Sequence, residues 1–104
     1  SQHTLDEQLD ILKQAITIAT RDDERRLILD RVKAIGQQST VQFVRSYLKT
    51  PALRSQAEAS LVHLARIREL RQTDPTIRTD LQVILKTSTD QKLKDRCKQF
   101  LSDY

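Results

Sequence analysis

Residues 50–61 read Thr-Pro-Ala-Leu-Arg-Ser-Gln-Ala-Glu-Ala-Ser-Leu, and a similar pattern returns at residues 90–101, Asp-Gln-Lys-Leu-Lys-Asp-Arg-Cys-Lys-Gln-Phe-Leu. Both stretches begin with a residue that can cap a helix, then place a leucine, a base, a small residue and a second leucine at matching positions. This spacing is typical of one face of a helix. A looser version starts at Arg21, and the three starts lie 29 and 40 residues apart. We therefore predict that the chain repeats one helical unit.

The composition favours helices throughout. The chain has 104 residues with one Gly and two Pro, and 38% of the residues are hydrophobic. Tight hairpins and phosphate-binding loops need backbone positions with positive φ, which glycine supplies, so the scarcity of glycine disfavours both. A chain of this length supports a single core, and we predict one all-α domain over residues 1–104.

Signals for helix starts occur six times and predict six helices. The first helix is expected to span about 5 to 20, and Gly36 is expected to end the second as its C-terminal stop. The start signals are the capping boxes Thr4/Glu7, Ser39/Gln42 and Ser88/Gln91, the acidic first turn at residues 21–24, and the pairs Thr50-Pro51 and Asp74-Pro75.

Short connections force successive helices to lie antiparallel, which predicts three hairpins at about 5–35, 39–72 and 74–102. The second and fourth helices carry apolar residues over more than one stripe. Such helices need cover on two sides, as in the middle layer of a stack. A plain six-helix bundle is the alternative fold.

At residues 50–61 the chain resembles the HEAT-repeat family, whose second helix often begins Asp-Pro-x-Val-Arg-x-x-Ala-x-x-x-Leu. The residues that hold these places are Thr50, Pro51, Leu53, Arg54, Ala57 and Leu61. The resemblance implies a right-handed α-solenoid of about three stacked hairpins. It also implies a non-enzymatic module excised from a larger, bacterial multidomain protein.

Residues for catalysis or metal binding are few. His3, His63 and Cys97 are the only histidines and cysteine, and nothing in their spacing brings them together. The carboxylates at residues 22–24 point around a helix axis rather than toward one ion. No apolar run approaches the ~20 residues of a membrane span. We therefore expect a soluble domain with no catalytic site, no metal and no cofactor.

Positive charge is concentrated in the middle of the chain. The net charge is +4, and residues 40–72 hold six Lys/Arg against two Asp/Glu. Basic stripes can bind nucleic acid, although aromatic residues for base stacking are scarce. Nucleic-acid binding is therefore the alternative function. Its candidate residues are Arg45, Lys49, Arg66 and Arg71.

The favoured function is protein–protein interaction or spacing between neighbouring domains of a parent chain. In a stack of hairpins the second helices line one concave face, and here that face would carry a mixed surface suited to a protein or peptide partner. The candidate partner-binding residues are Arg26, Asp30, Lys33, Ala59, Val62 and Arg66.

Overall fold

Seven α-helices and no β-strand make up residues 3–104, the part of the chain that the computed structural model describes. The all-helical class predicted from the composition is confirmed. None of these seven helices is long and apolar enough to cross a membrane. In chain order they are α1 (Leu5–Ile18), α2 (Asp22–Val32), α3 (Gln38–Arg45), α4 (Arg54–Ala65), α5 (Arg68–Thr73), α6 (Thr76–Thr87) and α7 (Gln91–Ser102).

The prediction of six helices is wrong by one because a break after Ala65 separates α4 from the short α5. Ile67 takes an extended conformation, with φ −82° and ψ 111°, and so interrupts the helix. Arg71 then turns back and its Nη1 donates to the carbonyl oxygen of Ala65 at 2.6 Å. The last carbonyls of a helix have no intrahelical donor, and this buried guanidinium supplies one.

Three of the predicted helix starts are formed as expected, and one of them is the acidic first turn of α2, which holds residues 22–24. Thr4 and Glu7 form a capping box, in which the Thr4 hydroxyl accepts from the Glu7 amide at 3.1 Å. Asp74 accepts from the backbone amide of Thr76 at 3.0 Å, directly before α6. At Thr4 and Asp74 a side-chain oxygen satisfies an amide that the helix itself leaves without an acceptor.

Three other start signals are corrected by the structure. α3 begins at Gln38 with no side-chain cap, so the Ser39/Gln42 capping box is absent. The cap of α7 is Asp90, which accepts from the Leu93 amide at 3.2 Å, and not Ser88. Pro51 lies in a turn, and α4 begins three residues later. Each region offers several capping residues in succession, and sequence alone does not rank them.

Gly36 has a different role from the predicted helix stop. Its φ is not positive, and α2 already ends at Val32. A Cβ at this position would lie 2.6 Å from Cδ1 of Ile67, well inside contact distance. A side chain at Gly36 would therefore require the tip of the Ile67 side chain to shift, and no left-handed conformation is involved.

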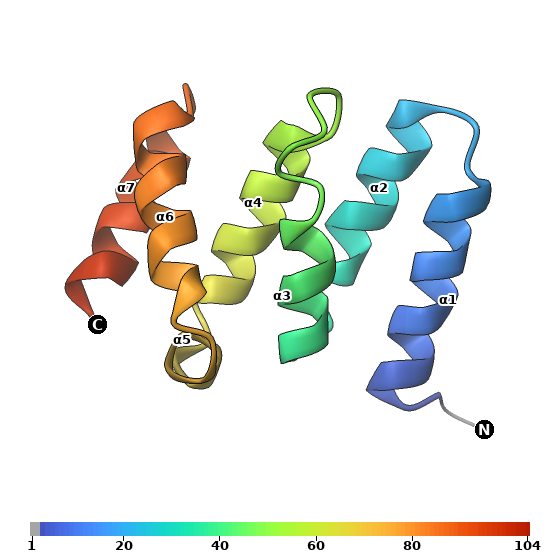
Figure 1. Ribbon diagram of the computed structural model, residues 1–104, viewed down its shortest axis with the longest axis horizontal. Helices are drawn as coiled ribbons and strands as arrows, with labels where there is room; N and C mark the ends of the chain where they lie inside the picture. The colour runs from blue at the N-terminus through green and yellow to red at the C-terminus, as the bar shows by residue number, and fades with distance from the viewer. Residues whose placement is uncertain (1–2) are drawn as a thin grey trace.

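α4 lies at the centre of the molecule, which measures 39 × 29 × 19 Å over the described residues. It packs against α2, α3 and α7, while α1 packs on α2 and α6 on α7 (Figure 1). Burial along α4 is almost continuous and supplies much of the core. Its fully or nearly fully buried apolar side chains are Ala57, Leu61, Val62, Leu64 and Ala65.

Candidate functional site

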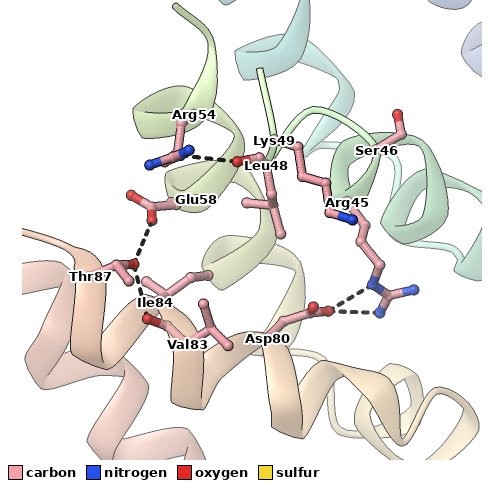
Figure 2. A pocket seen from close by; sticks show the side chains of 10 residues that line it. All are labelled: Arg45, Ser46, Leu48, Lys49, Arg54, Glu58, Asp80, Val83, Ile84 and Thr87. Atoms are coloured by element: carbon pink, nitrogen blue, oxygen red, sulfur yellow. Dashed lines mark hydrogen bonds and ion pairs between the residues drawn. The ribbon is translucent and has the colours of Figure 1, made fainter. Parts of the chain in front are cut away.

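A cleft of about 610 Å³ opens between the end of α3, the start of α4 and the face of α6 (Figure 2). α3 has 8 residues and α6 has 12, so the C-terminal half of α6 extends past α3 and faces the irregular segment 46–53 and the first turns of α4. The cleft is lined by Arg45, Ser46, Leu48, Lys49, Arg54, Glu58, Asp80, Val83, Ile84 and Thr87.

The middle of the cleft is apolar. Leu48 projects from the α3–α4 connection, and Val83 and Ile84 lie opposite it on α6 (Figure 2). Ile84 is buried, Leu48 is partly buried, and Val83 is 52% exposed. An apolar group that entered the cleft would cover these side chains and remove them from water, which is favourable at about 25 cal/mol per Å².

Arg45 closes one end of the cleft by pairing with two aspartates. Its Nη2 lies 2.9 Å from Asp74 Oδ2 and 2.8 Å from Asp80 Oδ2, and its Nε also donates to Asp80. Burial would raise the pKa of Asp74, but hydrogen bonds from Gln38 and Arg45 outweigh it and the pKa is lowered. For Asp80 burial prevails and the pKa is raised, despite the same guanidinium. This network connects α3 to α6.

Glu58 lies at the other end and is only 6% exposed. Its Oε2 is 3.3 Å from the Thr87 hydroxyl, which is also 2.9 Å from the Val83 carbonyl oxygen. A hydroxyl has one proton, and the carbonyl is the nearer acceptor. Burial raises the pKa of Glu58, and Thr87 and Arg54 oppose this shift. The ionised Glu58 carboxylate is therefore only weakly stabilised by hydrogen bonding to Thr87.

Lys49 and Arg54 are exposed at the mouth of the cleft. Arg54 Nε donates to the Leu48 carbonyl oxygen at 3.0 Å, which fixes that side chain near the connection. Within residues 3–104, neither cation lies within ion-pair distance of a carboxylate. The mouth of the cleft therefore carries two cations without an ion pair, although Arg54 is near enough to Glu58 to lower the pKa of that carboxyl.

The structure gives the predicted partner-binding residues unequal access to solvent. Val62 is fully buried, so its predicted role on an exposed face is wrong. Its helix packs against neighbours on several sides, and the apolar side chain is used in the core. Asp30 and Lys33 pair with each other at 2.8 Å. The other three are Arg26, which donates to the Ala52 carbonyl oxygen, Ala59, which is partly exposed, and Arg66, which is exposed.

The four basic residues considered for nucleic-acid binding do not form one surface. Arg45 is engaged by two aspartates, and Arg71 is 6% exposed with its guanidinium 5.6 Å from the ring of Phe100. Lys49 and Arg66 are exposed, but they flank opposite ends of α4. A helix of 12 residues spans about 18 Å, so these two cations are well separated.

Most residues of the cleft were missed by pattern analysis, although two carried a signal. Glu58 is the single acid of α4 and lies between two alanines, and Asp80 falls on the apolar stripe of α6 with Ile77 and Ile84. An acid on a buried face needs a partner, and this can be read from the sequence. The identity of the partners, Arg45 and Thr87, comes only from the fold.

The remaining candidate residues are Cys97 and His63, and burial shifts the pKa of each. Burial raises the pKa of the Cys97 thiol to about 11, so the thiolate is scarce near neutral pH. Burial and the nearby cations Arg66, Lys33 and Arg96 lower the pKa of His63. Over residues 3–104, no group of three or more His, Cys, Asp or Glu side chains is arranged to hold a metal ion.

Comparison with known proteins adds no assignment. No family model matches the chain, and neither curated proteins nor solved structures give a significant match.

Proposed function

We propose that this chain is a non-enzymatic protein-interaction module, built from three HEAT-like helical hairpins and belonging to a larger protein. The observation that carries this proposal is the cleft between the α3–α4 and α6–α7 hairpins, with its apolar centre and charged mouth. A site of this kind suits a short segment of a partner protein, because one apolar side chain can fill the centre while polar groups fix its orientation.

The packing of the helices supports the proposed solenoid. Helix pairs α1 with α2, α3 with α4, and α6 with α7 are in contact, as expected for hairpins. α4 also contacts α2 and α7, so the second helices of successive hairpins adjoin one another. This is the neighbour relation of a stacked repeat. A six-helix bundle with an added short helix is the alternative, and it leaves the proposed use of the cleft unchanged.

The distribution of charge favours a protein partner over nucleic acid. Phosphate backbones are bound by several adjacent cations, and affinity falls steeply with salt because counterions are released. In this chain two of the four candidate cations are occupied by the protein itself, and the two exposed ones are far apart. A peptide needs fewer charged contacts and gains from the apolar centre of the cleft.

Selection from a random peptide library displayed on phage tests the proposal. We expect enriched peptides whose affinity falls about tenfold or more in the Val83→Arg variant, because the arginine would occupy the cleft. Ile18→Arg is the matched control, since Ile18 is 79% exposed on α1 and lies outside the cleft. Failure to enrich any peptide, or equal binding to both variants, would contradict the proposal.

Duplex DNA is the probe for the alternative function. We expect only weak binding at physiological salt. Micromolar binding that Lys49→Glu and Arg66→Glu together abolish, and that falls steeply between about 50 and 200 mM salt, would instead support a nucleic-acid-binding domain.

A further inference from the structure

We propose that the cleft binds an acidic peptide segment that carries one apolar anchor residue, with Lys49 and Arg54 pairing with the acidic side chains. This inference rests on the proposed interaction function and specifies the chemistry of the partner. It follows from three features of the cleft: the two cations at its mouth, the apolar surface between its ends, and the burial of the acid Glu58 within it.

The two cations are the accessible charges of the site. Arg45 also lines the cleft, but its guanidinium is held by Asp74 and Asp80, so it adds no positive charge for a ligand. Lys49 and Arg54 are exposed and have no carboxylate partner within residues 3–104. Charge complementarity at such a mouth favours acidic partners and opposes basic ones.

The apolar surface lies between these cations and the buried end of the cleft. Leu48 and Val83 face each other across it, and Val83 is an aliphatic side chain that is 52% exposed (Figure 2). A leucine or similar side chain of a bound segment would cover both. The volume of about 610 Å³ falls within the range of pockets that hold small ligands, so the anchor side chain of a short segment fits.

Glu58 is the carboxylate that a basic segment would use, and its surroundings argue against that use. The side chain is 6% exposed and its carboxyl contacts the Thr87 hydroxyl. To reach it, a cationic group would have to lose its hydration and pass Lys49 and Arg54, which repel it. The burial of Glu58 and the two cations in front of it therefore make it a poor receptor for a basic group.

Titration of the ¹⁵N-labelled chain with four blocked pentapeptides tests the inference by NMR. The probes are Asp-Asp-Leu-Asp-Asp, its basic counterpart Lys-Lys-Leu-Lys-Lys, the neutral Ser-Ser-Leu-Ser-Ser, and Asp-Asp-Ser-Asp-Asp, which lacks the anchor. We expect the acidic leucine peptide to bind at least about fivefold more tightly than each of the others. The amides of residues 46–54 and 80–87 should shift, because they border the cleft.

Charge reversal then separates a specific pair from general attraction. Lys49→Glu should weaken binding of the acidic leucine peptide about fivefold to tenfold. Arg31→Glu changes the net charge equally but lies on the exposed surface of α2, and it should change the affinity by less than about twofold. Circular dichroism of both variants confirms that they fold alike. Equal weakening in both variants would overturn the assignment of Lys49.

The remaining outcomes distinguish this inference from the proposed function. If the lysine peptide binds best and Glu58→Gln abolishes its binding, the cleft is a receptor for basic segments. The inference is then wrong and the interaction function stands. The same holds if the neutral peptide binds as tightly as the acidic one. If no peptide shifts residues 46–54 and 80–87 and library selection also fails, both proposals fall.

Discussion

The central helix α4 and the pair α3 and α6 meet their neighbours in different ways. α4 packs closely against α2 and α7 through apolar side chains, and Leu61 is 1% exposed there. α3 and α6 are instead joined by Arg45 and its two aspartates, and beside this network the cleft opens (Figure 2). Apolar packing therefore holds α4 to its neighbours, whereas an ion network supports the connection between α3 and α6 beside the cleft.

Leu61→Ala tests the packing around α4 and should have the largest effect. The leucine is almost fully buried in the main core, so its truncation leaves a cavity and should lower the free energy of unfolding by about 2–5 kcal/mol. Urea denaturation measures this change. Val83→Ala in the cleft is the control, and it should cost less than about 0.5 kcal/mol because half of that side chain is exposed. Similar losses in the two variants would remove the distinction between the packing around α4 and the cleft.

Arg45→Met tests the polar connection and should have an intermediate effect. Methionine keeps much of the aliphatic stem but leaves Asp74 and Asp80 without their cation, at side-chain exposures of 6% and 11%. Buried acceptors that lose a partner cost about 1–3 kcal/mol, and we expect a loss of unfolding free energy in this range.

A second substitution separates loss of the ion network from loss of packing. Adding Asp80→Asn to Arg45→Met removes one of the uncompensated carboxylates, so it should restore part of the stability. Strictly additive losses in the double variant would show that Arg45 and Asp80 do not stabilise each other.

The main features of the packing around α4 could be predicted from the sequence. Helical class follows from the scarcity of glycine, and the burial of Ala57 and Leu61 follows from their repeated spacing. These features are local or periodic, so the spacing of residue types in the sequence can predict them. Val62 shows the limit, because it was assigned to an exposed face and is fully buried. Burial around a central helix depends on how many neighbours cover it, which no single stripe specifies.

The cleft could not be predicted in the same way. It exists because α3 stops at Arg45 and α4 starts only at Arg54, while the Thr50-Pro51 signal indicated an earlier start. Contacts such as Arg45 with Asp80 join residues 35 positions apart. Their formation depends on the relative placement of two hairpins, and that placement has no signature in the spacing of either one.

Glu58→Gln tests the buried end of the cleft and should have the smallest effect, visible as a change with pH. Burial raises the pKa of Glu58 in the folded state above its value in the unfolded chain, which is about 4.3. At pH 7 the folded protein holds an ionised carboxylate that is less stable there than in the unfolded chain, so replacement by glutamine should stabilise the fold. As the pH falls through the folded pKa toward the unfolded one, the folded protein takes up a proton first and the wild type recovers stability. The advantage of Glu58→Gln measured by urea denaturation should therefore be greater at pH 7 than at pH 4.5.

The difference in unfolding free energy between the wild type and Glu58→Gln reports on Glu58 alone, because Asp74 and Asp80 titrate in both proteins. Glu69→Gln on the exposed surface of α5 controls for the loss of one carboxylate. An advantage that is equal at both pH values would mean that water and Arg54 support the Glu58 carboxylate as well in the folded state as in the unfolded one. The buried end would then be a solvated acidic site, and the argument against a basic ligand would lose its main support. A clear decrease toward pH 4.5 would instead show that burial disfavours the Glu58 carboxylate, and would leave Lys49 and Arg54 as the exposed charges that a partner meets.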